Sequence, residues 1–172
     1  MRPGVRKLVL SVHLAVSVGW IGAAAAYLAL DVTTVATNDP PVLRAVYLGM
    51  DLILRSVIVP LSVATLISGI VISLGTRWGL FRHYWVVISL ALTVLATAVL
   101  LFETRTVSAL ADVAADPATT PQQLAALDST MVHSIGGIIV LGAMLALNVY
   151  KPRGATRYGW RKQQASQRKA SV

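Results

Sequence analysis

Long runs of hydrophobic residues, separated by short polar stretches, dominate the chain. The pattern does not alternate with a period of two, and the runs are too long for β-strands. Each run approaches the ~20 residues that an α-helix needs to cross ~30 Å of hydrocarbon. The pattern therefore predicts four transmembrane helices. The runs cover residues 8–30, 56–74, 86–102 and 131–150.

The polar connectors set wider bounds for these helices. Residues 38–41 (Asn-Asp-Pro-Pro) and 75–79 (Gly-Thr-Arg-Trp-Gly) are typical of turns. Pro60 lies inside the second run and is expected to kink that helix. Residues 1–152 are thus expected to form one transmembrane domain, followed by a basic tail over 153–172 that frays. The helices are expected over about residues 6–36, 43–75, 80–112 and 121–150.

The composition supports an all-α integral membrane protein. Hydrophobic residues make up 56% of the chain and charged residues 13%, about half the ~25% of an ordinary soluble domain. So few charges cannot coat a soluble globule, and the hydrophobicity excludes a disordered chain. The chain has no Cys, which excludes disulfides, thiolate metal sites, iron–sulfur clusters and Cys nucleophiles.

The charges predict the topology. The net charge is +8, and twelve of the fifteen Lys and Arg residues fall on one side of the predicted membrane, while the seven acids fall at or near the other. The positive-inside rule then predicts a four-helix up-down bundle with both termini in the cytoplasm. Anionic lipid headgroups explain the basic tail, so no nucleic-acid partner is expected. The twelve are Arg2, Arg6, Lys7, Arg77, Arg82, Lys151, Arg153, Arg157, Arg161, Lys162, Arg168 and Lys169.

Three histidines, His13, His83 and His133, are the main candidates for chemistry. An ionisable group inside a bilayer is costly and is a candidate functional residue for that reason. Neutral imidazole ligates metals and haem, and bundle cores build such sites from facing helices. Nearly all carboxylates lie outside the runs, which disfavours a cage for hard cations. The alternative is a neutral His that hydrogen-bonds Ser or Thr across helices.

Trp20 is expected to share a helix face with His13. The two are seven residues apart, which returns the side chains to nearly the same direction. Trp20 could wall an apolar cofactor pocket or simply fill the core. Gly19 and Gly22 could leave the gap that a flat macrocycle needs, or could allow close helix packing.

The pattern His13-x6-Trp20-x-Gly22 resembles the first-helix motif of CopD-type copper-resistance proteins and of HemJ-type protoporphyrinogen oxidases. The chain more closely resembles an uncharacterised family of four-helix bacterial membrane proteins related to both. Three segments carry that closer resemblance, which covers nearly the whole chain. They are residues 75–85 (GTRWGLFRHYW), 132–137 (VHSIGG) and 150–154 (YKPRG).

The resemblance implies a location in the bacterial cytoplasmic membrane and haem b held by intramembrane histidines. HemJ-type proteins also use a Lys in the membrane core. No Lys lies inside a predicted span here, so the resemblance does not extend to protoporphyrinogen oxidation.

Depth in the membrane limits which ligands can pair. His13 follows Lys7 by six residues and is about 9 Å deep, at ~1.5 Å per residue. His83 adjoins Arg82 at the inner interface, about 8 Å from the level of His13. His133 lies eighteen residues before Lys151, about 27 Å deep. These depths permit His13 to pair with His83 but not with His133.

Other residues extend the candidate set. Met144 is level with His13, which leaves a His/Met site open. Arg55 could bind haem propionates or a quinone oxygen, or could form an interfacial pair with Asp51 four residues before it. His83, flanked by basic and aromatic residues, could equally belong to an interfacial belt.

The leading interpretation is a membrane b-type haem protein with cofactor contacts from His13, His83, His133, Trp20 and Arg55. Electron transfer to a quinone or a redox partner protein is expected. Whether the protein is a haem-dependent oxidoreductase, and whether it forms a homo-oligomer, stays open. The first alternative is copper or other metal handling, with the three histidines and Met side chains as ligands. The second is a non-catalytic accessory subunit of a membrane complex.

Overall fold

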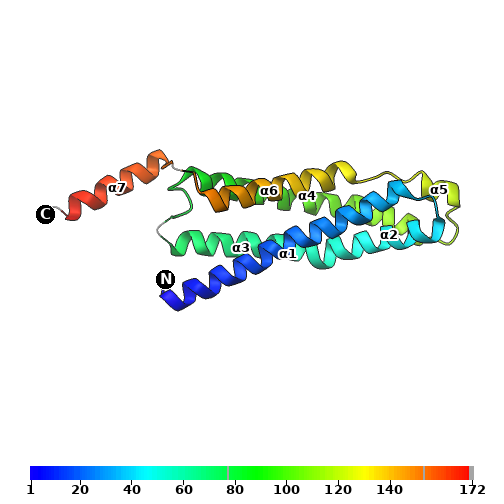
Figure 1. The fold of residues 1–172 in the computed structure, drawn as a ribbon, viewed down its shortest axis with the longest axis horizontal. Coiled ribbons are helices and arrows are strands. Elements are labelled where there is room, and N and C mark those ends of the chain that lie inside the picture. Colours follow the sequence, from blue (N-terminus) through cyan, green and yellow to red (C-terminus); the bar gives the residue numbers. More distant parts are fainter. Residues whose placement is uncertain (77, 153, 171–172) are drawn as a thin grey trace.

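The computed structural model describes residues 1–76, 78–152 and 154–170; Arg77 and Arg153 of the basic set therefore lie outside the described residues. The described chain is α-helical, and its β-pairing is limited to an isolated bridge between His83 and Ala155. Figure 1 shows the arrangement of the helices. They are α1 (Pro3–Ala36), α2 (Pro40–Ile53), the π-helix η1 (Leu54–Ile58), α3 (Val59–Gly75), α4 (Tyr84–Ala115), α5 (Pro121–Ala125), α6 (Met131–Tyr150) and α7 (Arg157–Ala170).

Within the described part of the chain, four helical stretches are long and apolar enough to cross a bilayer. They are α1, the continuous stretch Pro40–Gly75, α4 and α6. The stretch Pro40–Gly75 has 36 residues and is therefore about 54 Å long, well beyond the ~30 Å of a hydrocarbon core. The expected all-helical class, with four helices able to span a membrane, is confirmed.

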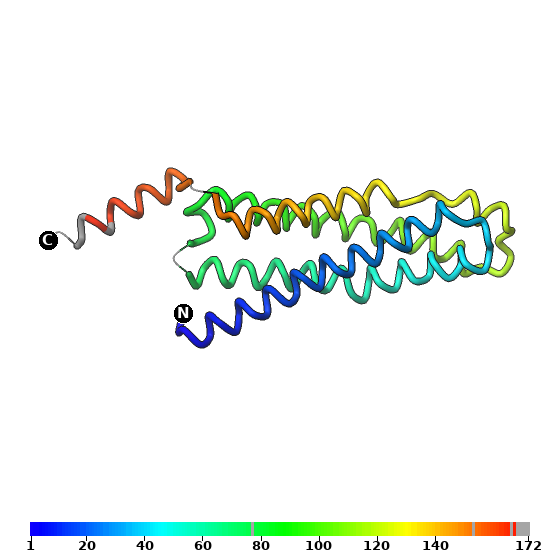
Figure 2. The backbone as a smooth tube through the Cα atoms, viewed as in Figure 1, coloured from blue at the N-terminus to red at the C-terminus, as the bar shows by residue number. Residues whose placement is uncertain are grey.

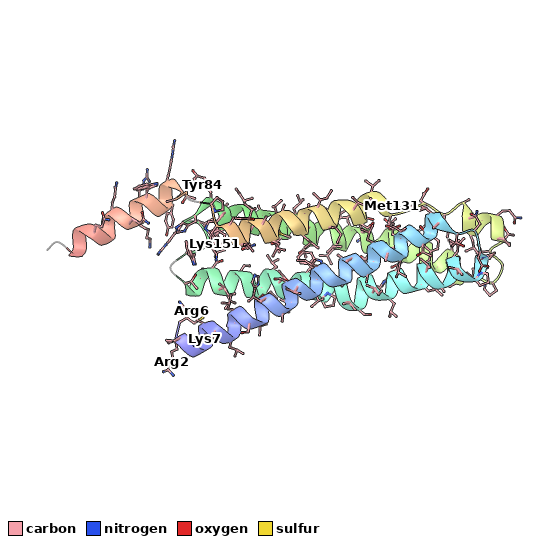
Figure 3. The ribbon with its side chains drawn as sticks, viewed as in Figure 1. Arg2, Arg6, Lys7, Tyr84, Met131 and Lys151 are labelled. Carbon is pink, nitrogen blue, oxygen red and sulfur yellow. The ribbon has the colours of Figure 1, made fainter. Side chains whose placement is uncertain are left out.

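The two ends of the bundle differ in charge. Figure 3 places Arg2, Arg6, Lys7 and Lys151 at the same end, which we call the basic end. The opposite end, called the α5 end, holds the connections from α1 to α2 and from α4 to α6. Three exposed carboxylates, Asp39, Asp112 and Asp116, belong to it. The segregation of charge expected from the sequence is therefore present in the fold.

A buried core concentrates toward the α5 end. Leu43 and Met50 of α2 and Leu124 of α5 are each 1% exposed. Arg44 reinforces this end by donating hydrogen bonds to the carbonyls of Ala114, Asp116 and Thr119, at 2.6–2.7 Å. Nearer the basic end, large apolar side chains such as Leu8, Leu14 and Leu74 are more than half exposed. The most deeply buried side chains thus lie toward the α5 end, while exposed apolar side chains occur along the whole bundle, such as Leu52 and Val132 in the α5 half.

The expected single helix over 121–150 is wrong, because the chain breaks between α5 and α6. Thr120 and Gln123 form a capping box at the start of α5. Helix α6 starts only at Met131, after the N-cap Thr130. Thr130 is itself tied to α1, through the hydroxyl of Tyr27 and the carboxylate of Asp31. This tertiary anchoring fixes the start of α6.

The described part of the tail forms a helix, α7. Thr156 caps α7, since its hydroxyl accepts a hydrogen bond from the Gly159 amide at 3.1 Å and its carbonyl accepts one from the Trp160 amide at 3.0 Å. Figure 2 shows α7 projecting from the basic end, away from the bundle.

Pro60 lies in the first turn of α3, two residues after a π-helical segment. The residue has no amide proton, and its ring would clash with the carbonyl of Ser56, four residues earlier. The wider π-helical turns of η1, over Leu54–Ile58, lie immediately before it and contain Ser56. We attribute η1 to this local relief, since π-helical turns accommodate such a mismatch inside an α-helix.

Candidate functional site

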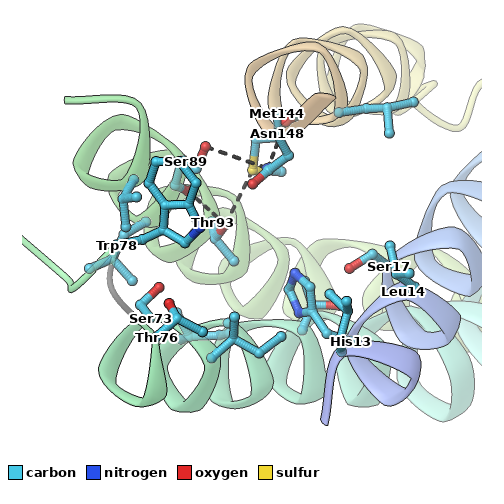
Figure 4. A pocket seen from close by; sticks show the side chains of 18 of the residues that line it. His13, Leu14, Ser17, Ser73, Thr76, Trp78, Ser89, Thr93, Met144 and Asn148 are labelled. Atoms are coloured by element: carbon cyan, nitrogen blue, oxygen red, sulfur yellow. Dashed lines mark hydrogen bonds between the residues drawn. The ribbon is translucent and has the colours of Figure 1, made fainter. Parts of the chain in front are cut away.

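A cavity of about 790 Å³ lies between α1, α3, α4 and α6, in the half of the bundle nearer the basic end. Its lining extends from Arg6 and Lys151 at that end to Trp20 and Leu141 in the interior. The volume falls within the ~300–1,000 Å³ typical of small-molecule and cofactor sites. Figure 4 shows side chains from several helices converging on this space.

His13 of α1 projects into the cavity (Figure 4). Its Nδ1 lies 2.9 Å from the hydroxyl oxygen of Ser68 on α3. That hydroxyl already donates its one proton toward the carbonyls of Ala64 and Thr65, at 2.6 and 3.2 Å. With its proton on the backbone, Ser68 is assigned as the acceptor from His13, and the imidazole proton is assigned to Nδ1. The lone pair of Nε2 is then available for a ligand.

Gly69 makes the close approach of His13 to α3 feasible. A Cβ atom built at Gly69 would lie 3.3 Å from Cε1 of the imidazole, which is tighter than an ordinary van der Waals contact. The absence of a side chain there lets the ring lie directly against α3. Ser68 and Gly69 together fix the position of the imidazole.

Trp20 lines the same cavity and is 2% exposed. It also belongs to the main hydrophobic cluster, so it contributes to both the cavity wall and the core. His13 and Trp20, seven residues apart, therefore line the same cavity, as their spacing predicts.

Met144 of α6 lines the cavity as well. The Thr93 hydroxyl of α4 points its one proton toward both the Ser89 carbonyl, at 2.7 Å, and the Met144 sulfur, at 3.2 Å. Because the carbonyl is the nearer and stronger acceptor, the thioether lone pairs stay available for a ligand. Asn148, one turn later, donates to the Met144 carbonyl at 2.7 Å. Figure 4 shows this polar group on the α4 and α6 side of the cavity.

Several buried hydroxyl groups on the cavity lining have no hydrogen-bond partner within the described chain. They belong to Ser17, Thr65 and Thr76. Thr65, on α3 one turn before Ser68, is only 7% exposed. Buried hydroxyls are nearly always hydrogen-bonded in folded proteins, so these groups can bond water or polar atoms of a molecule in the cavity.

His83 lies outside the cavity lining, at the start of α4. Its Nδ1 is 3.0 Å from the Trp78 carbonyl, and its ring meets the Trp78 indole edge-on at 5.1 Å between centroids. Its backbone bridges Ala155. These contacts tie the connection before α4 to the segment before α7.

His133 lies near the start of α6, toward the α5 end. Its side chain is 57% exposed, and Nε2 lies 3.5 Å from a carboxylate oxygen of Glu103 on α4. Among the described residues, no three His, Cys, Asp or Glu side chains gather as a metal site. The three histidines therefore occupy three separate places.

Arg55 is also remote from the cavity. It lies in η1, where Nε is 2.8 Å from the Asp51 carboxylate and from the Ser108 hydroxyl of α4. Asp51 accepts a further hydrogen bond from Ser108 at 2.5 Å. Arg55 thus pairs with Asp51, as one of the two alternatives predicts, and links η1 to α4.

Asp31 is a buried ionisable residue. From its position in the sequence it was expected with the other acids, at or near the side opposite the basic residues. Its carboxylate is 0% exposed. It accepts hydrogen bonds from the hydroxyls of Ser129, Thr130 and Ser134, at 3.2, 3.0 and 2.7 Å. These groups surround the N-terminus of α6, where the helix dipole favours a negative charge. The sequence signal that could have predicted this buried carboxylate is an Asp directly after an apolar run, together with a cluster of Ser and Thr before another run.

No protein-family model, curated protein or solved structure matches this chain. A functional assignment therefore depends on the geometry of the cavity and on the chemistry of its lining.

Proposed function

We propose that this chain is a haem-b-binding protein of the bacterial cytoplasmic membrane, with the haem in the cavity between α1, α3, α4 and α6. The observation that carries the proposal is His13: its imidazole projects into the cavity with Nδ1 bonded to Ser68 and Nε2 available. Nε2 is a common axial ligand of haem iron, and a hydrogen bond on Nδ1 holds such a ligand in place.

The other lining residues fit a tetrapyrrole. Trp20 and Leu141 supply an apolar wall for a flat ring. Met144 supplies a sulfur atom at the same cavity, as His/Met ligation requires. A haem bound there would supply one-electron redox chemistry. We infer electron exchange with a membrane quinone or a redox partner protein.

The proposed topology is an up-down bundle with both termini in the cytoplasm. The positive-inside rule supports it, since the basic end carries Arg2, Arg6, Lys7 and Lys151. In this orientation the cavity lies in the cytoplasmic half of the membrane.

The proposal is tested by visible spectroscopy of the protein purified in detergent with haem supplied. We expect a sharp Soret band and, after reduction with dithionite, split α and β bands of low-spin haem b. His13→Ala should lose this spectrum. His83→Ala and His133→Ala are matched controls outside the cavity and should retain it. A protein that stays colourless after haem titration would exclude the proposal.

Copper handling is the second candidate, favoured by the presence of His13 and Met144 on one cavity. Imidazole and thioether are ligands that suit copper. Copper analysis of the same purified protein separates the two proposals. One bound copper per chain, lost in both His13→Ala and Met144→Leu, together with no haem spectrum, would favour copper.

A further inference from the structure

Two cationic side chains line the cavity at the basic end, one from α1 and one from the residue after α6. Arg6 comes from the first turns of α1, and Lys151 follows directly after α6. No carboxylate side chain lines the cavity, and all seven acids of the chain fall elsewhere. Neither cation forms an ion pair with a carboxylate within the described part of the chain. The positive charge at this end is therefore uncompensated by the protein.

The backbone at Lys151 gives independent support for a role of its side chain. Lys151 has φ 43° and ψ 64°, in the left-handed region, and is the C-cap of α6. Its amide donates to the Leu147 carbonyl at 3.0 Å. Gly or Asn is the usual residue in this conformation, and a Lys there costs about 1 kcal/mol. A strained position that keeps a cation at a cavity suggests that the cation has a function.

The interior of the cavity has the opposite character. Trp20, Leu141 and Leu14 line it, together with the unpartnered hydroxyls of Ser17 and Thr65. A molecule matched to both regions has a broad apolar body with a few polar atoms and an anionic end that faces Arg6 and Lys151.

We propose that Arg6 and Lys151 bind the carboxylates of the cavity's ligand, so that a dicarboxylate tetrapyrrole sits with its acid groups toward the basic end and its ring against Trp20. This inference rests on the proposed function. It adds to that function the orientation of the ligand in the cavity and assigns Arg6 and Lys151 as positioning residues. Arginine suits the planar carboxylate, and lysine adds a point charge.

The test measures binding of metal-free protoporphyrin IX to the full chain in phosphatidylcholine nanodiscs. Tryptophan fluorescence reports binding, because Trp20, Trp78 and Trp85 line the cavity. The metal-free ring needs no axial ligand, so this readout is independent of His13. Zwitterionic lipid removes competition from anionic headgroups for the two cations.

The variant with Arg6→Gln and Lys151→Gly removes both charges. Glycine suits the left-handed C-cap, so the second change is expected to preserve the fold. We expect about tenfold weaker binding, because two solvent-exposed charge pairs are lost and each contributes modestly. The dimethyl ester of protoporphyrin lacks the acid groups and should bind both proteins equally. Arg2→Gln with Lys7→Gln is the matched control, because these two cations are exposed like Arg6 and Lys151 but do not line the cavity.

Three results would overturn the inference. The first is equal affinity of the charge variant and the parent for protoporphyrin. The second is the same loss of affinity for the diester. The third is no binding of either porphyrin, which would also overturn the proposed function. If the charge variant binds protoporphyrin more weakly but His13→Ala keeps a normal haem spectrum, Arg6 and Lys151 still bind the carboxylates. The proposal that His13 ligates the haem iron is then wrong.

Discussion

At the scale of single residues, a hydroxyl determines which nitrogen of His13 is available. Ser68 donates to the backbone of its own helix and therefore accepts from Nδ1. This arrangement sets the tautomer and orients the ring without any charged partner. A neutral imidazole is suited both to an apolar cavity and to metal ligation.

Ser68→Ala is expected to weaken haem binding by about 10–100-fold, the usual range for loss of a hydrogen bond that holds a ligand. The measurement is a haem titration followed at the Soret band. Ser62→Ala is the matched control, because Ser62 is a buried serine of α3 that donates to its own helix at 2.8 Å. Equal affinities of the two variants would contradict the assigned role of Ser68.

At the scale of elements, two contacts of α1 organise the bundle. Near the basic end, His13 packs against Gly69 of α3. Near the α5 end, Asp31 receives three hydroxyl hydrogen bonds around the start of α6. The first contact shapes the cavity and the second fixes a helix terminus, so substitutions at the two sites should have separable effects.

Gly69→Leu should displace the imidazole and abolish haem binding while the protein stays folded. The space for the new side chain is already taken, since even a Cβ would lie 3.3 Å from the His13 ring. Gly22→Leu is the control, because nothing lies within 4 Å of a Cβ at that position. Haem titration checks both variants. Retained binding in Gly69→Leu would rule out the proposed position of the haem ligand.

Asp31→Ala should destabilise the protein by about 1–3 kcal/mol, because it leaves buried hydroxyls at the α6 terminus without their acceptor. Thermal unfolding in detergent should show a melting temperature several degrees below that of the parent. The exposed Asp112 provides the comparison, since Asp112→Ala should unfold like the parent. Indistinguishable curves for the two variants would show that the buried carboxylate is not structural.

At the scale of the whole molecule, the chain combines an apolar cavity-bearing half with a tightly packed α5 end. The topology of this assembly can be tested cleanly, because the protein has no native Cys. Asn38→Cys, in the turn after α1, should react with a membrane-impermeant maleimide on intact bacterial cells. Ala165→Cys, exposed in α7, should react only after lysis. The reverse pattern would invert the proposed orientation.

Much of this architecture could be predicted from periodicity and charge alone. Four apolar runs predict the four long helices, and a seven-residue spacing predicts that His13 and Trp20 face one space. The break before α6 could not be predicted in this way, because Thr130 is held by Asp31, 99 residues away. The tautomer of His13 likewise depends on a serine 55 residues distant. Such contacts become visible only when helices are placed side by side.

The most direct test of the account is imidazole rescue of the His13→Ala variant, followed by the visible spectrum of the haem-loaded protein. The account predicts that this variant lacks the low-spin bands and that added imidazole, entering the space left by the side chain, restores them. Loss without rescue in a folded protein would place the haem ligand elsewhere. An unchanged spectrum in His13→Ala before imidazole is added would contradict the central claim outright.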